Sequence, residues 1–200
     1  MILLSIDVGI RNLAYILIQV NDIDKHVILK WDVLELIKSN EKANQVQNTY
    51  IGNSLCNQFD DILPKYNIDI ILIENQIGQN AIKMKTIQGM INMYFVMKNY
   101  PLSSIINYNA VHKLKPFLNE KKTTYAERKK LSKEITLKLC ETYYEESILN
   151  FYKSFKKKDD LADCLLQGLD YIRKQDKLSS SFYENLIILL WNELKFKDKI

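Results

Sequence analysis

The sequence is short of the residues that build disulfide frameworks, disordered chains and membrane spans. Its three cysteines (Cys56, Cys140 and Cys164) are odd in number and lack paired spacing, which argues against a disulfide framework and a zinc site. Five glycines and three prolines in 200 residues exclude collagen-like and low-complexity chains. Apolar runs such as Leu186–Trp191 are far shorter than the about 20 residues that cross a bilayer. We therefore expect an intracellular globular protein in a reducing compartment, without a membrane partner.

The positive charge of the chain is concentrated in one stretch. The whole chain carries a net charge of +4, whereas Lys113 to Lys138 holds nine basic and three acidic residues, a net charge of +6. A second basic run, at residues 153–158, directly precedes an acidic pair. Local positive potential attracts nucleic acid, although a solvated helix face in a lysine-rich chain would look the same. The DNA-binding candidates are Lys113, Lys115, Lys121, Lys122, Arg128, Lys130, Lys156 and Lys157.

Hydrophobic periodicity predicts an α/β fold with a mixed sheet in one domain. The chain is long enough for a single core, and 47% of its residues are apolar. Three runs near the start are typical of a strand meander, and the continuous apolar run before Glu74 predicts a strand buried on both faces. Two capping-box pairs, Thr124 with Glu127 and Ser181 with Glu184, mark helix starts. The expected strands are 2–7, 13–20, 27–34, 68–74 and 105–108, and the expected helices are 41–63, 80–98, 125–144, 160–173 and 182–196.

Acidic residues occur where a sheet could bring them together. Asp7 and Glu74 end apolar strands, and Asp160 and Asp163 share one face of a helix. Buried carboxylates that converge repel each other unless a cation neutralises them, and oxygen ligands suit Mg²⁺ or Mn²⁺. Two such ions about 4 Å apart could activate water for phosphodiester hydrolysis. Each acid also has an ordinary alternative: Asp7 in a turn, Glu74 in a lysine pair and Asp160 at a helix start.

Four short motifs, in order along the chain, resemble those of one enzyme family. They are SIDVGIRNLAY (residues 5–15), LIENQ (72–76), YAERKK (125–130) and KDDLAD (158–163). Together they resemble the motifs of the RuvC-like Holliday junction resolvases, and they look closest to the poxvirus and fungal mitochondrial branches. The resemblance spans residues 2–172, and it favours a large DNA virus as the source and the host cytoplasm or viral factory as the place of action.

The resemblance implies an RNase H-like fold with a mixed five-stranded sheet flanked by helices over residues 1–173, followed by a C-terminal helical extension over residues 174–200. It implies a homodimer that uses Mg²⁺, with Mn²⁺ as a substitute, to cut four-way DNA junctions symmetrically in recombination or viral genome processing. By position, Asp7, Glu74, Asp160 and Asp163 would be the catalytic metal ligands. Lys129 matches the catalytic lysine of viral relatives, with Lys130 as the close alternative.

Three other functions stay open on the sequence alone. An Asp-x-Gly turn after a strand also occurs in actin-like ATPases, but the further glycine-rich nucleotide motifs of that class are missing. A non-catalytic DNA-junction-binding scaffold would keep the fold without the chemistry, and would gain nothing from clustered acids. A related RNase H-like nuclease could act on another branched or hybrid substrate, which only substrate tests distinguish.

Overall fold

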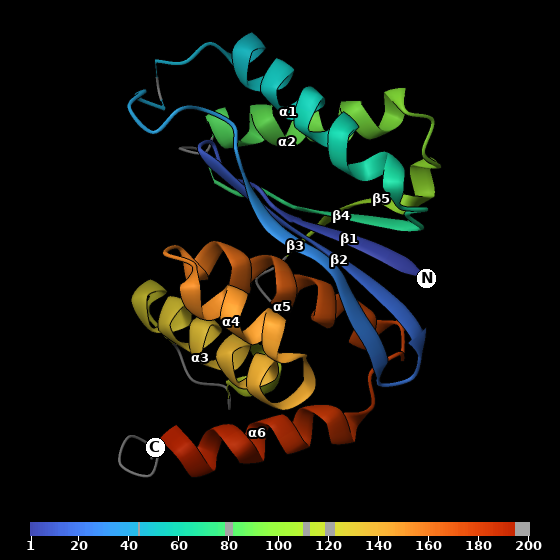
Figure 1. Ribbon diagram of the computed structural model, residues 1–200, viewed down its shortest axis with the longest axis vertical. Coiled ribbons are helices and arrows are strands. Elements are labelled where there is room, and N and C mark those ends of the chain that lie inside the picture. The colour runs from blue at the N-terminus through green and yellow to red at the C-terminus, as the bar shows by residue number, and fades with distance from the viewer. Residues whose placement is uncertain (44, 79–81, 110–112, 119–122, 195–200) are drawn as a thin grey trace.

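The computed structural model describes the chain except for residues 44, 79–81, 110–112, 119–122 and 195–200. Its centre is a five-stranded sheet in the order β3-β2-β1-β4-β5 (Figure 1). Strands β1, β2 and β3 form an antiparallel meander, whereas β4 and β5 run parallel to β1. The carboxyl ends of β1, β4 and β5 therefore meet at one edge of the sheet. The strands span Ile2–Asp7 (β1), Asn12–Asp22 (β2), Lys25–Glu35 (β3), Ile70–Glu74 (β4) and Ile105–Tyr108 (β5).

The helices largely follow the expected pattern, with three differences. Helix α1 begins at Asn48 and not near residue 41, because Arg11 and Lys83 donate to backbone carbonyl groups between Lys38 and Val46 and hold that segment as a loop. Helix α4 has no counterpart among the expected helices. The expected Ser181–Glu184 capping box is wrong, since α6 begins at Ser180. The helices span Asn48–Ile62 (α1), Ile82–Met97 (α2), Tyr125–Tyr143 (α3), Glu146–Ser154 (α4), Lys158–Lys174 (α5) and Ser180–Leu194 (α6).

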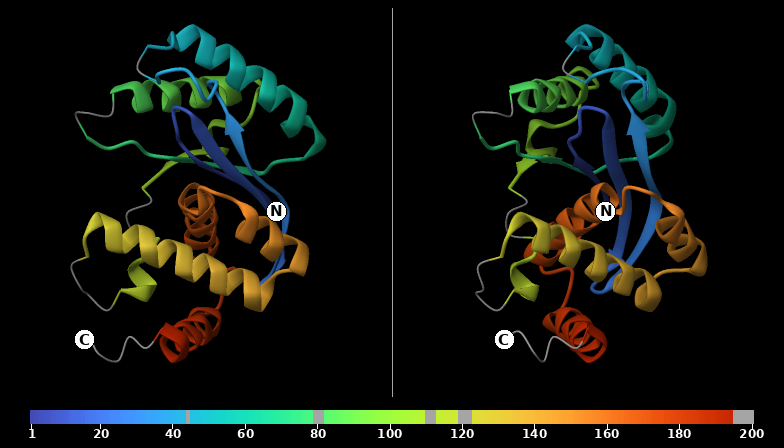
Figure 2. Two further views of the ribbon diagram at one scale, coloured as in Figure 1. Left: turned by 60° about the vertical axis from the view of Figure 1, so that its left-hand side comes forward. Right: turned by 90° about the vertical axis from the view of Figure 1, so that its left-hand side faces the viewer.

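Helices cover both faces of the sheet, and the alternation of side chains along β1 explains why. Leu4 and Ile6 pack in a core with α1 and α2, whereas Leu3 points to the other face, in a core with α3, α5 and α6. Figures 1 and 2 show α1 and α2 on one side of the sheet and α3 to α6 on the other. Within the described ranges, none of the helices combines the length and apolar character that crossing a bilayer requires.

Helix α6 packs into the same core as α3 and α5. Its inward side chains are buried, and it lies beyond α3, as seen from the sheet (Figure 1). Ser179 connects its start to the β2–β3 turn: the Ser179 hydroxyl donates to Asp24 at 2.6 Å and accepts a hydrogen bond from the backbone N–H of Phe182 at 3.2 Å. Ser179 therefore does the capping that the sequence pattern assigned to Ser181. The buried side chains of α6 are Phe182, Tyr183, Leu186 and Leu190.

Candidate active site

Asp7 and Glu74 lie side by side because they end neighbouring parallel strands. The register pairs Ile6 with Ile73, so the next residue on each strand reaches the same edge of the sheet. After Asp7 the chain turns at Gly9, where an added Cβ would lie 1.8 Å from the carbonyl oxygen of Asn12. No side chain fits there, so the tight turn that returns the chain into β2 requires glycine.

Close packing of α5 on the sheet brings Asp163 to the same edge. At Gly168, an added Cβ would lie 3.0 Å from Cδ1 of Ile18, so the helix approaches β2 very closely. Near the helix start, the Ser5 hydroxyl donates to the carbonyl oxygen of Cys164 at 2.7 Å. These two contacts fix α5 against β1 and β2. Asp163 consequently lies close enough to Asp7 for its charge to raise the pKa of Asp7.

The pKa of Asp7 is raised well above its ordinary value. Burial is the largest cause, followed by the negative charges of Glu74 and Asp163, whereas Lys113 acts in the opposite direction. A hydrogen-bonding interaction with the side chain of Glu74 adds to this rise in the pKa of Asp7. We call Asp7, Glu74 and Asp163 the acid cluster. Within the described part of the chain, these three acids have one ion pair, with Lys113, and the cluster therefore favours the binding of protons or cations.

Lys113 supplies a positive charge inside the acid cluster. Its side chain is 11% exposed, and its Nζ lies 2.7 Å from Oδ1 of Asp163. Burial acts to lower the pKa of Lys113, but the charges of Asp163, Asp7 and Glu74 outweigh it and raise that pKa. The sequence placed Lys113 with Lys115 among the DNA-binding candidates. In the structure Lys115 is exposed, whereas Lys113 faces the carboxylates.

Asp160 and Lys129 lie at the margin of the acid cluster. Burial and the charge of Asp159 raise the pKa of Asp160, while Lys157 and Lys129 act to lower it. Lys129 itself lies 2.5 Å from Oδ2 of Asp159, so its ammonium group is held at the start of α5. Asp160 as a metal ligand and Lys129 as a catalytic group therefore remain predictions.

Basic side chains lie around the N-terminal ends of α3 and α5. The ion pair between Lys129 of α3 and Asp159 of α5 connects these two helix ends. Lys130 is 77% exposed and lies 3.8 Å from Glu134. Arg128 is exposed and donates to the carbonyl oxygen of Thr123 at 2.7 Å. The remaining described candidates here, Lys156 and Lys157, are also exposed, whereas Lys121 and Lys122 lie outside the described residues.

The acid cluster fits a hard divalent cation by its chemistry. Its three acids offer only carboxylate oxygens, which Mg²⁺ and Mn²⁺ prefer, and its negative charge is in excess. Among the described residues, no three Asp, Glu, His or Cys side chains are spaced as ligands of one ion. In the structure Asp163 is held by Lys113, and Glu74 accepts a hydrogen bond from Gln76. A cation would therefore compete with Lys113 for Asp163.

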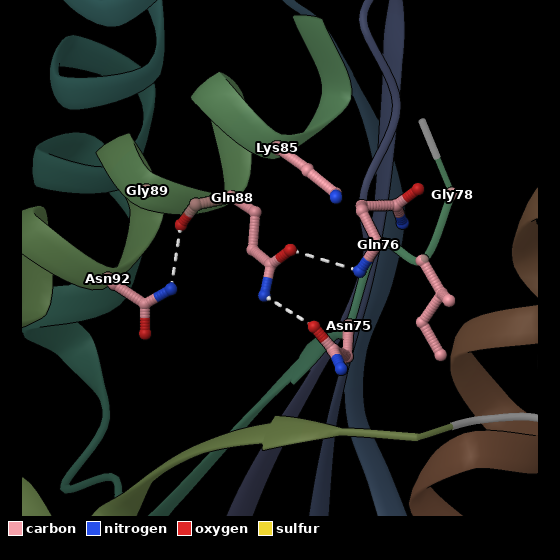
Figure 3. Close-up of a pocket in the computed structure, with 8 residues that line it drawn as sticks. Asn75, Gln76, Gly78, Lys85, Gln88, Gly89 and Asn92 are labelled. Carbon is pink, nitrogen blue, oxygen red and sulfur yellow. Dashed lines mark hydrogen bonds between the residues drawn. The ribbon is translucent and has the colours of Figure 1, made fainter. Parts of the chain in front are cut away.

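An amide side chain from the segment after β4 supports Glu74. Nε2 of Gln76 donates to Oε2 of Glu74 at 2.7 Å, and the backbone N–H of Gln76 donates to Oε1 of Gln88 at 2.9 Å (Figure 3). Gln76 lies in the LIENQ motif at residues 72–76, although the motif gave no role for its side chain. Gln88 carries no signal in the sequence, because its role depends on how α2 packs beside β4.

The sheet order, with acids at the ends of β1 and β4 and on the helix that covers them, defines an RNase H-like fold of the RuvC type. The fowlpox virus resolvase in complex with Holliday junction DNA superposes with a TM-score of 0.58 at 21% identity, over 88% of this chain and 99% of that one. The yeast mitochondrial Holliday junction resolvase Ydc2 superposes with a TM-score of 0.63 at 18% identity, over 95% of this chain and 85% of that one. RuvC of T. thermophilus in complex with a Holliday junction superposes with a TM-score of 0.58 at 15% identity, over 88% of this chain and 97% of that one.

The chain belongs to the Poxvirus A22 protein family, whose profile matches residues 1–175. This is a family of RuvC-like Holliday junction resolvases, so the chain is a structure-specific endonuclease of that class. Both the resemblance seen in the four motifs and the expected RNase H-like fold are confirmed. No curated protein sequence matches the chain.

Proposed function

We propose that the chain cuts four-way DNA junctions by metal-dependent hydrolysis at the acid cluster, with Asp160 completing the ligand set. The observation that carries the proposal is the convergence of Asp7, Glu74 and Asp163, from β1, β4 and α5, around a buried lysine. Clustered negative charge repels phosphates, so it serves no purpose in a protein that only binds DNA. It does serve a nuclease that must hold Mg²⁺ or Mn²⁺ next to the scissile bond.

Each side chain has a distinct role in this proposal. The divalent cation, when bound, supplies Lewis acidity and makes water a stronger nucleophile. The acid cluster holds that cation, and the carboxamide of Gln76 orients Glu74. Lys113 is placed to stabilise the negative charge that develops on the scissile phosphate. Lys129, held by Asp159 at the basic margin, is placed to contact the phosphate or the neighbouring DNA backbone.

A homodimer gives the two cuts that a two-fold junction needs. Helix α2 and the turn after it expose an apolar surface, whereas exposed helix faces are ordinarily polar. A second copy of the chain, bound through this surface about a two-fold axis, would present two acid clusters to one junction. We call these residues the α2 apolar surface: Met93, Val96, Met97 and Leu102, which are 55%, 40%, 69% and 75% exposed.

The test is incubation of the protein with a four-way junction labelled on each strand in turn. With Mg²⁺ we expect paired nicks at symmetric positions, and none with a chelator. Asp7→Asn should abolish cutting while junction affinity stays within about threefold, because Asp7 binds no DNA in this proposal. Asp61→Asn, an exposed acid on α1, is the matched control and should cut normally.

Two results would contradict the proposal. Cutting by Asp7→Asn at the wild-type rate would exclude the acid cluster as the site of chemistry. Preferential cutting of linear duplexes, flaps or RNA–DNA hybrids by the wild type would instead favour a related nuclease with another substrate.

A further inference from the structure

Lys129 and Asp159 form a close ion pair between α3 and α5, at the margin of the acid cluster. Nζ of Lys129 lies 2.5 Å from Oδ2 of Asp159, and it also lies 5.2 Å from the centroid of the Tyr125 ring, within the range of a cation–π contact. The next lysine on α3 differs, because Lys130 is 77% exposed and its Nζ lies 3.8 Å from Glu134. Lys129 is therefore held on two sides, whereas Lys130 has a loose pair at the helix surface.

The two helices that carry this pair are anchored in one core. Ile135 of α3 and Leu161 of α5 are fully buried in the same hydrophobic cluster. A side chain held between well-packed helices keeps its direction better than one on a loop. Burial and the charge of Asp159 raise the pKa of Asp160, whereas the charge of Lys129 acts to lower it. The ammonium group of Lys129 therefore lies near the acid that we expect to complete the ligand set.

DNA affinity does not explain the presence of Asp159. A carboxylate at this margin repels phosphates and cancels part of the positive charge of Lys129. An acid in the first turn of α5 stabilises the helix through its dipole, but Asp160 lies in the same turn and has the same effect. Affinity for DNA therefore gives no reason for Asp159, and helix stability gives a small one.

Holding the Lys129 ammonium group in one direction gives a stronger reason. A lysine has a flexible four-carbon stem and loses much rotamer freedom when its ammonium group is fixed. The ion pair fixes this group before DNA arrives, so the loss does not oppose the reaction step. The hydrogen bond with Asp159 raises the pKa of Lys129, which stays a cation at neutral pH. An ammonium group has three N–H donors, and the Lys129 side chain is still 36% exposed, so a phosphate oxygen can reach it.

We propose that Asp159 is a positioning residue for the cutting reaction: it holds the ammonium group of Lys129 beside Asp160, where that group contacts the scissile phosphate. This inference rests on the proposed function, because the phosphate belongs to the junction DNA. Asp159 touches neither the cation nor the DNA and acts through Lys129 alone. Loss of its charge should consequently slow the chemical step without weakening the binding of the junction.

The test is a double-mutant cycle on single-turnover cutting of a labelled four-way junction with Mg²⁺. Asp159→Asn keeps the size of the side chain and should cut about tenfold more slowly, while junction affinity stays equal or rises because a repelling charge is lost. Lys129→Met should cut more slowly still. Adding Asp159→Asn to it should change the rate by less than about twofold, since no ammonium group is left to hold. The matched control is Glu134→Gln, which removes the acid beside Lys130 with the same change in charge and should cut at the wild-type rate.

Carbon-13 relaxation of the lysine Cε groups, measured without metal or DNA, gives a second readout that needs no cutting. The two signals of interest are identified by their loss in Lys129→Met and Lys130→Met. In the wild type, Cε of Lys129 should be more rigid than Cε of Lys130. In Asp159→Asn the two groups should be similarly mobile.

Normal cutting by Asp159→Asn, or equal rigidity of Lys129 in Asp159→Asn and in the wild type, would overturn the inference. A loss of rate that persists in full when Lys129 is already methionine would also overturn it, because Asp159 would then act on α5 and not through the lysine. Failure of the wild type to cut any junction would count against the proposed function, while the relaxation measurement still tests whether Asp159 holds Lys129.

Discussion

At the residue scale, the acid cluster has an uneven balance of charge. Asp7, Glu74 and Asp163 lie together beside Lys113. The ammonium group of Lys113 pairs with Asp163, and its charge acts to lower the pKa of Asp7. Burial and the neighbouring acids raise the pKa of Asp7 well above its ordinary value, which favours the protonated form of this carboxyl group. A folded state with excess buried charge of one sign is stabilised by any ligand of the opposite sign. Cation binding and folding stability should therefore be linked in this molecule.

Lys113→Met tests this link. Without metal at neutral pH, the loss of the positive charge should lower the free energy of unfolding by about 2 kcal/mol, because the acid cluster is left unpaired. Below the raised pKa of Asp7 the difference from wild type should shrink, since Asp7 is protonated there and the acid cluster carries less negative charge. Added Mn²⁺ should bind more tightly than to the wild type and restore the stability. Chemical denaturation with and without Mn²⁺, over a range of pH, measures all three effects.

The matched control is Lys115→Met, which removes an exposed lysine two residues further along. It should leave both stability and Mn²⁺ affinity within error of the wild type. With Mg²⁺, Lys113→Met should cut junctions about 100-fold more slowly in a single turnover, with little change in junction affinity. Normal cutting together with weakened, salt-sensitive junction binding would instead make Lys113 a backbone contact.

The sequence could predict the acids of the site but not the lysine among them. Asp7 and Glu74 end runs of apolar residues that form strands, and Asp163 sits on a helix with a regular leucine stripe. Local pattern therefore determines where these three acids point. Lys113 lies outside the helices and strands, and its place depends on its ion pair with Asp163 of α5, which leaves no periodic pattern in the sequence.

At the scale of elements, α6 behaves as part of the domain although the family profile ends at residue 175. Its inward side chains belong to the same hydrophobic cluster as α3 and α5. Tyr183 packs on Phe117, in the loop that carries Lys113, with ring centroids 5.6 Å apart. Helix α6 therefore supports the segment that brings Lys113 to the acid cluster, as well as the β2–β3 turn.

Leu186→Ala should consequently lower the free energy of unfolding by about 3 kcal/mol, because Leu186 is 1% exposed and the change leaves a cavity. Ile188→Ala, at a position that is 56% exposed on the same helix, should change it by less than about 0.5 kcal/mol. Urea denaturation of the two variants gives the comparison. Equal stabilities would show that α6, in the C-terminal extension expected over residues 174–200, does not stabilise the domain.

The elements that sequence predicted well are those with strong local signals. Strands β1 and β5 have the expected bounds, and Thr124 and Glu127 form the expected capping box of α3. The start of α1 was misplaced because contacts with Arg11 and Lys83, distant in sequence, hold residues before Asn48 as a loop. Helix α4 was missed because nine residues give too little periodicity to recognise.

At the scale of the whole molecule, the α2 apolar surface and α6 lie on opposite sides of the sheet (Figure 1). A dimer formed through α2 would therefore leave α6 free and the acid clusters of both copies accessible. The α/β class followed from the order of strands and helices in the sequence. The α2 apolar surface could not be predicted from the sequence. Periodicity cannot distinguish a helix face that packs within the same chain from one that binds a second copy.

Met97→Glu should convert the dimer to monomers, since it buries a charge in the proposed interface. Sedimentation velocity measures the change, and the labelled junction should then show single nicks in place of paired ones. Ile188→Glu introduces the same charge at an exposed apolar residue of α6 and should remain dimeric. A wild type that sediments as a monomer when bound to a junction would rule out the α2 interface.

The order of elements along the chain also determines when the acid cluster can be completed during synthesis. All five strands are complete at Tyr108, but Asp163 arrives only with α5. The face of the sheet that packs on α3, α5 and α6 therefore lacks its main helix until α5 has been synthesised. A shortened polypeptide that lacks α5 consequently keeps two of the three members of the acid cluster. The cluster can be completed only after the ribosome has passed residue 163.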